Sequence, residues 1–567
     1  MNRNNERHFL NVPQMHTSRT RFNRDQTILT TFDSGKLIPF FVDEVLPGDT
    51  FQVDTSAIIR MSTPKYPVMD DAFIDFYYFF CPNRIIWDDF KRFMGEADET
   101  PWAPTKTYKV PQIQLGNDIK GGPPQPFEES VLDYMGVPTK SIQAGSKALK
   151  INALPVRAYV KIWNEYFRDE NVGNPAKLKT TSEDIEYTDI LDDHDPSWGM
   201  TTALGGGHCL PVNKFHDYFT SCLPYPQRGP EVTLPLGGNA PVGMYKDTKL
   251  TQFGTVGGHT EIYLNQTLSG NALAPHIGNS QNAEYKGYGL ITGSSDPATQ
   301  VDDTAYLGAD LSRVTAATIN DLRNAVAVQQ YYEALARGGS RYREQVQALW
   351  GVTISDKTVQ IPEYLGGGRY HVNMNQIIQT SGQQSDTDTP IGETGAMSVT
   401  PVNESSFTKS FEEHGFVIGV LCVRHNRSYQ QGLERFWSRE DRLDYYVPQF
   451  ANLGEQPVKK KEIMLTGTSK DEETFGYQEA WADYRMKPNR VSGKMRSNAE
   501  GTLDFWHYGD NYKEVPTLSQ GWMMEGQEEI ARTLIVQNEP QFLAAIRVAN
   551  KTTRCMPLYS VPGLYKL

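Results

Sequence analysis

Residues 64–96 read PKYPVMDDAFIDFYYFFCPNRIIWDDFKRFMGE. The segment from Phe73 to Phe80 is a nearly continuous run of aromatic and aliphatic side chains, and successive side chains of a strand point to opposite faces. A strand with bulky apolar residues on both faces must be covered on both sides, so we expect it in the middle of a β-sandwich or barrel. Pro82 ends this strand. An amphipathic helix is predicted after it, because apolar residues follow at spacings of four and three: Ile86, Phe90 and Phe93.

Two further segments predict strands of different kinds. From Phe51 to Met61 apolar residues alternate with mostly polar ones, which is typical of a strand with one wet face. From Phe416 to Val423 all eight residues are apolar or glycine, which predicts a second strand buried on both faces. Many short β-prone segments separated by Gly and Pro indicate an all-β fold, an antiparallel barrel or sandwich.

Helices are few. Pro155 suits a first helical turn, and the apolar residues from Val156 to Phe167 recur at spacings of three and four, which predicts a helix packed on the barrel. A second helical region spans about 315–348 and is interrupted at Gly338-Gly339. Its apolar positions in step are Ile319, Leu322 and Val326.

The chain has 567 residues and a formal charge of −13, which argues against a protein covered with nucleic-acid contacts. Five scattered cysteines without a C-x-x-C pair fit reduced thiols, and Cys81 and Cys422 lie in apolar strand patterns. The longest apolar run has eight residues, too short for a membrane span, and no signal peptide is recognisable. We therefore expect a soluble protein made inside the cell.

Basic side chains gather at both ends of this acidic chain and in one internal run. Basic chain ends on an otherwise acidic protein fit a shell whose interior contacts phosphate groups. The alternative is that these chain ends are simply polar and bind no ligand. The internal run, YRMKPNRVSGKMR, suits single-stranded DNA, with a solvated face or a salt bridge between subunits as the alternative. The DNA-facing candidates are Arg3, Arg7, Arg19, Arg21 and Arg24 near the start, Arg485, Lys487, Arg490, Lys494 and Arg496 in the run, and Arg547, Lys551 and Arg554 near the end.

Other clusters point less clearly to chemistry. The acidic segment 183–195 offers Asp192, Asp193 and Asp195 as weak candidates for a hard cation, but it lacks the glycine turn and spacing of an EF-hand, so a solvated loop is the favoured interpretation. The segment Gly366-Gly367-Gly368-Arg369 resembles a phosphate-binding loop without its lysine, and we interpret it as a turn. No nucleophile or metalloprotease motif is present. The sequence therefore predicts a protein that is not an enzyme and needs no cofactor.

The opening block resembles the major capsid proteins of Microviridae phages, in particular those of the gokushovirus branch. Similar blocks follow in the same order as in that family and span most of the chain. They are LPVRAYVKIWNEYFRDEN (154–171), YYEALARGGSRYREQ (331–345), GVLCVRHNRSYQQGLERFWSREDRLDYYVPQFANLGEQPV (419–458) and GYQEAWADYRMKPNRVSGKMRS (476–497). Several blocks in register are far more specific than one short motif.

The resemblance implies an eight-stranded antiparallel jelly-roll barrel with long inserted loops and a few helices. It also implies that about sixty copies close a T=1 icosahedral shell around circular single-stranded DNA and present the host-attachment surface. The partners implied are other copies of the chain, the DNA genome, an internal scaffolding protein, a small basic DNA-packing protein, a minor pilot protein and a host receptor. The expected location is the virion, with assembly in the host bacterial cytoplasm.

The domain organisation follows from composition and from these blocks. We expect a basic arm inside the shell (1–30), the first part of the jelly roll (31–228), an insertion (229–309) and the second part of the jelly roll with a basic tail (310–567). The insertion is rich in Gly, Thr and Asn and has no arginine, and the resemblance implies that it forms a protrusion on the three-fold axis.

Two other classes stay open: a phage receptor-binding protein without a shell, and a carbohydrate-active β-protein. Neither explains the basic ends. Aromatic side chains in apparent loops suit the interfaces of a self-assembling shell, although many of them are expected in the core. These are Trp437, Tyr445, Tyr446, Trp481, Trp506 and Tyr508.

Overall fold

The computed structural model describes residues 18–96, 107–115, 128–139, 149–186, 207–233, 242–246, 249–250, 263–265, 289–291, 305–309, 318–378, 380 and 394–559. Strands in mainly antiparallel sheets dominate there, with some helices, which confirms the predicted all-β class. The chain divides into two compact units, one made of Met1–Arg228 and Glu333–Leu567 and the other of Gly229–Tyr332. In the described part, no helix is long and apolar enough to cross a membrane.

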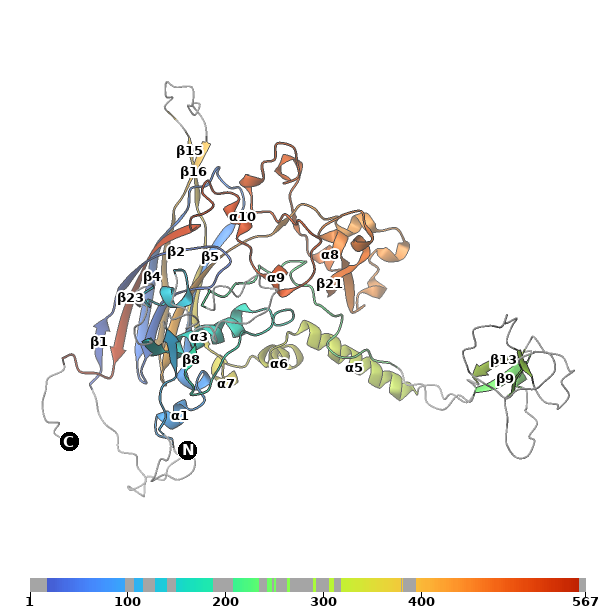
Figure 1. The fold of residues 1–567 in the computed structure, drawn as a ribbon, viewed down its shortest axis with the longest axis horizontal. Helices are drawn as coiled ribbons and strands as arrows, with labels where there is room; N and C mark the ends of the chain where they lie inside the picture. The colour runs from blue at the N-terminus through green and yellow to red at the C-terminus, as the bar shows by residue number, and fades with distance from the viewer. Residues whose placement is uncertain are drawn as a thin grey trace, which may run out of the picture. The chain divides into compact units, whose positions relative to one another are not determined.

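Two antiparallel sheets form the centre of the first unit (Figure 1). In the first sheet, both β1 and β2 pair with β23, and β4 and β17 follow in that order. Its strands are β1 (Thr20–Asn23), β2 (Gln26–Phe32), β23 (Phe542–Arg554), β4 (Thr50–Met61) and β17 (Thr400–Ser410). The second sheet has the order β14 (Glu363–His371), β5 (Ala72–Pro82), β18 (Gly415–His425) and β3 (Ile38–Val45).

The main core lies between these sheets. Tyr78 of β5 reaches the first sheet, where its hydroxyl lies 2.7 Å from Thr55 Oγ1 and its ring lies 5.4 Å from that of Phe407. Phe80 packs against Phe411 at 4.7 Å between ring centroids. In the described part, no strand of one sheet pairs with a strand of the other. The two sheets thus form a sandwich, and the predicted closed barrel is not confirmed.

The outer faces of the two sheets differ as the sequence predicts. In β4 and β23 buried residues alternate with exposed or half-buried ones, so the first sheet has one wet face. In β5 and β18 nearly every residue is buried, including Cys81 and Cys422. Helix α3 (Leu154–Ile162) and the following π-helical turn (Trp163–Phe167) cover the second sheet, where Phe79 of β5 packs against Tyr166 at 4.7 Å.

Two local predictions are wrong. The helix expected after Pro82 is only a 3-10 turn (Asn83–Ile85) and the short helix α1 (Phe90–Phe93). Gly366 to Gly368 are part of strand β14 rather than a turn. Their lack of side chains permits close strand contact, because a Cβ atom on Gly367 would lie 2.0 Å from the carbonyl oxygen of Phe76 in β5.

Helix α5 (Ile319–Arg337) and helix α6 (Tyr342–Trp350) confirm the interrupted helical region. Ile319, Leu322 and Val326, which the sequence places in step, are all exposed. Shorter described elements are α2 (Val131–Tyr134), α7 (Asp356–Val359), α8 (Ala482–Arg485), α9 (Gln520–Met523), α10 (Glu528–Ala531), β6 (Gln112–Leu115), β7 (Leu149–Asn152), β8 (Ile185–Glu186), β9 (Val242–Lys246), β10 (Lys249–Leu250), β11 (Tyr263–Asn265), β12 (Gly289–Ile291), β13 (Ala305–Ala309), β15 (Met374–Ile378), β16 (Thr394–Ser398), β19 (Ser428–Tyr429), β20 (Glu455–Lys459), β21 (Thr474–Glu479) and β22 (Asn489–Arg490).

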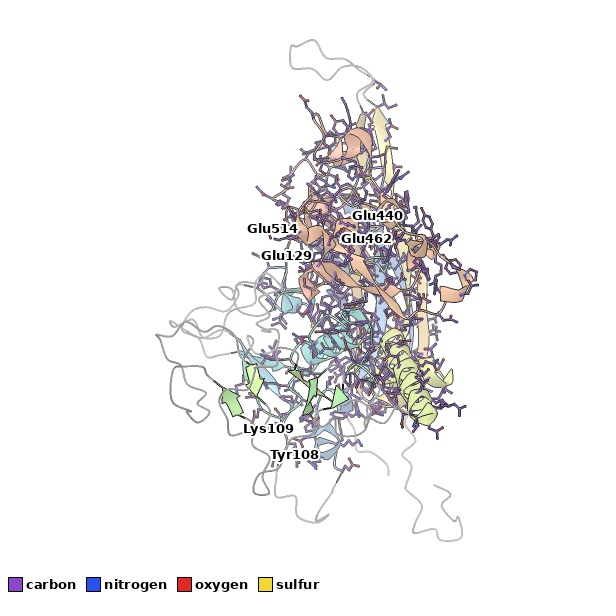
Figure 2. All side chains as sticks on the ribbon, turned by 90° about the vertical axis from the view of Figure 1, so that its right-hand side faces the viewer. Tyr108, Lys109, Glu129, Glu440, Glu462 and Glu514 are labelled. Carbon is purple, nitrogen blue, oxygen red and sulfur yellow. The ribbon has the colours of Figure 1, made fainter. Side chains whose placement is uncertain are left out.

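The connection between β18 and β23, residues 426–541, carries a second, smaller core. It joins Tyr218 and Phe219 from an earlier part of the chain to Tyr429, Val458 and Phe475. Glu440 and Glu462, labelled in Figure 2, belong to this connection, the first on the surface and the second buried. The connection is therefore a packed part of the first unit and not an open loop.

Candidate nucleic-acid interface

The wet face of the first sheet brings together basic residues from three adjacent strands. On β23, Arg547 and Lys551 point outward, because their neighbours Ile546, Val548 and Thr552 are buried. Arg21 of β1 lies opposite Thr553 of β23, which points to the same face of the sheet as Arg547 and Lys551. Neighbouring strands lie about 4.8 Å apart, so these cations occupy one continuous surface.

The charges on this face are only partly compensated. Arg21 donates to Gln52 Oε1 at 2.8 Å, and Arg547 forms an exposed ion pair with Asp25 at 3.0 Å. Lys551 forms no ion pair among the described residues. Arg19, also exposed, donates to the carbonyl of Gly48 at 2.6 Å. Exposed cations bound only to neutral or weakly paired groups are suited to contact phosphates.

Sequence reasoning missed Arg60, which is exposed on the same face of β4. The alternating pattern of Phe51–Met61 could have predicted this, because Arg60 is one of the alternate residues that point to the wet face. Arg60 lines a groove of about 980 Å³ at the free edge of β2, together with Leu29 and the carboxylates of Glu129 and Asp133. Glu129 is labelled in Figure 2. Burial, and then Asp33 nearby, raise the pKa of Glu129, so this carboxyl group is protonated more easily than an ordinary glutamate.

Two of the terminal candidates form ion pairs within the subunit. Arg24 holds both carboxylate oxygens of Asp43, at 2.5 and 2.7 Å. Arg554 donates to the fully buried carboxylate of Asp49 at 2.8 Å, and its guanidinium lies over the ring of Phe51. These pairs tie the two ends of the chain to strands β3 and β4, so the geometry gives both arginines a structural role.

The internal basic run is divided in the same way. Arg485 pairs with Glu479 at 2.8 Å, and both Lys487 and Arg490 pair with Glu434. Lys494 and Arg496 lie on or next to a 3-10 turn (Gly493–Met495), are exposed, and form no ion pair in the described part. The first three residues therefore serve contacts inside the subunit, and only the last two offer open charges.

Several candidates cannot be placed. Arg3, Arg7, Asp192, Asp193 and Asp195 lie outside the described residues. Among the described residues, no group of three His, Cys, Asp or Glu side chains is arranged to hold a metal ion.

The sequence did not indicate the buried ion cluster at the end of β18. Arg427 donates to Asp510 at 2.6 Å and to Glu525 at 2.5 Å, and His425 Nδ1 lies 2.5 Å from the other oxygen of Glu525. Burial opposes ionisation of Glu525, but Arg427 and His425 outweigh it and lower its pKa to about 2. All four side chains are buried. The cluster fastens the 426–541 connection to the second sheet and is closed to a ligand.

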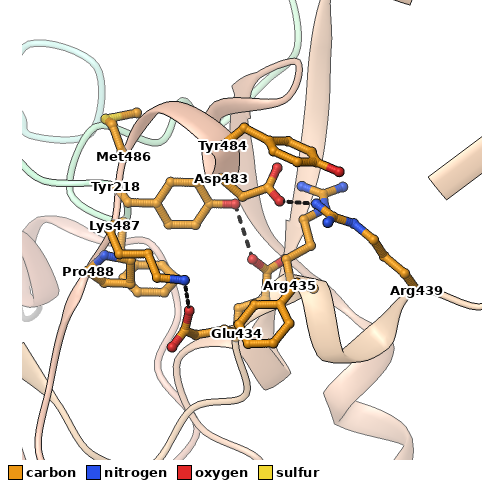
Figure 3. A pocket seen from close by; sticks show the side chains of 12 residues that line it. Tyr218, Glu434, Arg435, Arg439, Asp483, Tyr484, Met486, Lys487 and Pro488 are labelled. Carbon is orange, nitrogen blue, oxygen red and sulfur yellow. Dashed lines mark hydrogen bonds and ion pairs between the residues drawn. The ribbon is translucent and has the colours of Figure 1, made fainter. Parts of the chain in front are cut away.

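A pocket of about 230 Å³ in the same connection is lined by charged side chains that pair with one another (Figure 3). Arg439 pairs with Asp483, Lys487 pairs with Glu434, and the Tyr218 hydroxyl donates to Glu462 at 3.1 Å. Burial raises the pKa of Glu462. These pairs brace the loops around the pocket, and we assign no catalytic group to it.

Comparison of the sequence with known proteins finds capsid proteins. The chain is 37% identical to the capsid protein VP1 of Chlamydia phage 1 and 36% identical to the capsid protein VP1 of Bdellovibrio phage phiMH2K, in each case over 99% of this chain and 98% of the relative. It is 35% identical to the capsid protein VP1 of Spiroplasma virus 4, over 97% and 96%. The family model described as capsid protein (F protein) matches residues 10–564. The chain therefore belongs to the capsid protein (F protein) family of Microviridae phages.

Proposed function

We propose that this chain is the major capsid subunit, of which about sixty copies close a T=1 icosahedral shell around circular single-stranded DNA. The observation that carries this proposal is the match to a capsid family over residues 10–564, with three relatives named capsid protein VP1 that align over nearly their whole length. The function is structural: the shell encloses the genome and presents the surface that attaches to the host.

We further propose that the two sheets form a jelly roll. The pairing order supports this, because its eight main strands fall into two sheets of four, β2-β23-β4-β17 and β3-β18-β5-β14. Along the chain successive strands switch from one sheet to the other, except between β5 and β14. Two interlocked Greek keys produce such an alternation.

The wet face of the first sheet is the surface that we propose to face the DNA. Arg19, Arg21, Arg547 and Lys551 supply its positive charge, and the arm that carries Arg3 and Arg7 leads into β1 at its edge. Lys494 and Arg496 are a second, smaller candidate. Arg24, Arg485, Lys487, Arg490 and Arg554 are each engaged by a carboxylate of the same subunit, as Arg547 is by Asp25. Arg19, Arg21 and Lys551 are therefore the better-suited candidates among the described residues.

The remaining parts of the proposal concern partners and place. Assembly in the host bacterial cytoplasm would involve an internal scaffolding protein, a small basic DNA-packing protein and a minor pilot protein. The insertion 229–309 would form the three-fold protrusion that meets the host receptor. Its sequence supports this in one respect, because a segment rich in Gly, Thr and Asn cannot build a large core of its own.

The test is negative-stain microscopy and a sedimentation profile of the protein from infected or co-expressing cells, with and without nuclease. Uniform particles that protect single-stranded DNA are the expected result. A species of one to three subunits in the presence of scaffold would contradict the shell and favour a receptor-binding or carbohydrate-active protein.

A further inference from the structure

The 426–541 connection exposes a cluster of large apolar side chains, which we call the aromatic patch. Each member is between 40% and 68% exposed. The patch consists of Phe436, Trp437, Leu443, Tyr445, Tyr446 and Tyr484. Trp481, Trp506 and Tyr508, which the sequence grouped with some of these residues, are not members: Trp481 and Tyr508 are buried and Trp506 is half-buried.

Contacts between rings and cations join members of the patch into two groups, and Phe436 and Tyr484 also line the same pocket. The rings of Phe436 and Trp437 lie 4.8 Å apart, and those of Tyr446 and Tyr484 lie 6.2 Å apart. The guanidinium of Arg439 bridges the middle, 4.3 Å from the ring of Tyr484 and 5.5 Å from that of Tyr445. Lys487 lies over Phe436 at 4.8 Å. Aromatic rings with arginine among them are the composition that protein interfaces favour.

The loops below the patch are held in place without any partner. Arg439 pairs with Asp483 and Lys487 with Glu434, as Figure 3 shows. Trp481 Nε1 donates to the carbonyl of Phe450 at 2.9 Å. The patch is therefore pre-organised, and a partner would bind it without the entropic cost of ordering these loops.

The area of the patch is close to what one side of a stable interface requires. Six side chains of about 200 Å² each, exposed by about half, present on the order of 600 Å². A standard interface buries about 800 Å² on each partner, whereas the largest apolar patch of a monomer is rarely above about 600 Å². The charged residues around the patch would supply the remaining buried area, roughly 200 Å².

The charges around the patch favour a second copy of the chain over DNA. Residues 434–446 and 479–490 together carry six acidic and six basic side chains. A surface of zero net charge, on which four of the six cations are paired with Glu434, Glu479 and Asp483, does not attract a polyanion strongly. A surface with equal numbers of acidic and basic side chains can pair with a second copy of itself about a two-fold axis, where each contact occurs twice.

We propose that the aromatic patch is a like-on-like contact between two copies of this chain, arranged about a two-fold axis. This proposal rests on the proposed shell, for which it names one subunit contact. Trp437 and Tyr445 would lie against residues 434–446 and 479–490 of the second copy. Arg442, exposed on the patch, would meet an acidic residue of the group Glu440, Asp441 and Asp444.

A photo-crosslinking amino acid, p-benzoylphenylalanine, in place of Trp437 tests the contact directly in particles made with scaffold. The expected result is a covalent dimer whose crosslink maps to residues 434–446 or 479–490 of the second chain. The same replacement at Tyr225, which is equally exposed but lies outside the patch, is the control and should give no crosslink to those residues. A crosslink from Trp437 to DNA, to another protein or to another region of the second copy, or no crosslink at all, would overturn the proposal.

Assembly yield provides the second readout. The double variant Trp437→Glu/Leu443→Glu should lower the particle yield by at least about tenfold, as removal of an interface hot spot does, while Ile535→Glu, an exposed apolar control, stays within about twofold. An unchanged melting temperature of the free subunit shows that the variant is folded, and Trp437→Phe should retain assembly. Particle yield unaffected by the double variant would contradict the contact. If the wild-type protein forms no particles, the shell proposal fails. The crosslink from the Trp437 replacement is then induced in the protein from the same cells without purification of particles, where the mapped dimer supports the patch and its absence overturns it.

Discussion

The two sheets of the first unit have strands of similar length, yet their outer faces differ. In the first sheet, β4 and β23 alternate between buried and accessible residues, and the outer face carries polar and basic side chains. In the second sheet, β5 and β18 are buried on both faces, and α3 with its π-helical turn covers the outer one (Figure 1).

This difference shows what each sheet contributes. The long connections pack on the second sheet. Its charged groups are paired, as Asp75 is with Arg369 and Arg424, and these pairs contribute to stability. Among the described residues, the outer face of the first sheet is exposed or half-buried, and Arg21 and Lys551 form no ion pair there. The same strand architecture thus supports a packed side and a side available for a ligand.

The largest difference between the sheets is expected in core substitutions. Phe79→Ala, on the covered face of β5, should lower the free energy of unfolding by about 3–5 kcal/mol, because it leaves a cavity beside Tyr166. Leu29→Ala, on the wet face of β2, should change it by less than about 0.5 kcal/mol, since this side chain is 79% exposed. Urea unfolding of the purified subunit measures both. Equal losses would mean that the wet face is covered in the free subunit.

The sequence predicts the parts of this comparison that depend on local pattern. Alternation in Phe51–Met61 and continuous apolarity in Phe416–Val423 identify one strand of each sheet, because burial on one or two faces leaves a direct imprint on neighbouring residues. The prediction of a helix after Pro82 was wrong because apolar spacing alone does not decide whether the chain is helical. Ile86, Phe90 and Phe93 have helical spacing, but Ile86 is buried at the end of a turn that precedes α1.

Long-range pairings are beyond such patterns. Arg554 and Asp49 are 505 residues apart, and only the pairing of β23 with β4 brings them together. For the same reason the sequence could not separate exposed Trp437 from buried Trp481, since both stand in aromatic loop segments. All the DNA-facing candidates, including those that form ion pairs within the subunit, stay a prediction.

The second contrast concerns ion pairs. Arg427→Met should lower the free energy of unfolding by about 3–5 kcal/mol, because it leaves Asp510 and Glu525 buried without their main counter-charge. Arg547→Met breaks an exposed pair with Asp25 on the wet face and should cost no more than about 1 kcal/mol. Urea unfolding of both variants, with unchanged m-values, measures the two losses in the free energy of unfolding. A loss for Arg547→Met as large as that for Arg427→Met would contradict the assignment of the wet face.

Acid should weaken the buried ion cluster around Glu525. The pKa of Glu525 is about 2 in the folded protein, below its ordinary value of 4.5, so its ionisation stabilises the fold above about pH 4.5. This stabilisation is lost as the pH falls from about 4.5 towards 2. Glu525→Gln should therefore be less stable than wild type at pH 7, and the difference should shrink towards pH 2. A difference that is constant over this range would mean that Glu525 does not titrate with folding.

The smallest effect on stability, and the one most specific for function, is expected on the wet face. Arg547→Gln/Lys551→Gln should leave the free energy of unfolding within about 0.5 kcal/mol of that of the wild type. It should reduce the slope of log affinity against log salt for a fluorescent single-stranded oligonucleotide by about 0.7 per removed phosphate contact. Lys494→Gln/Arg496→Gln, which removes the two exposed cations of the second, smaller candidate in the 426–541 connection, is the matched comparison and should reduce the slope by less. The opposite result would assign the DNA to that connection, and the wet face of the first sheet would then need another partner to explain its uncovered charges.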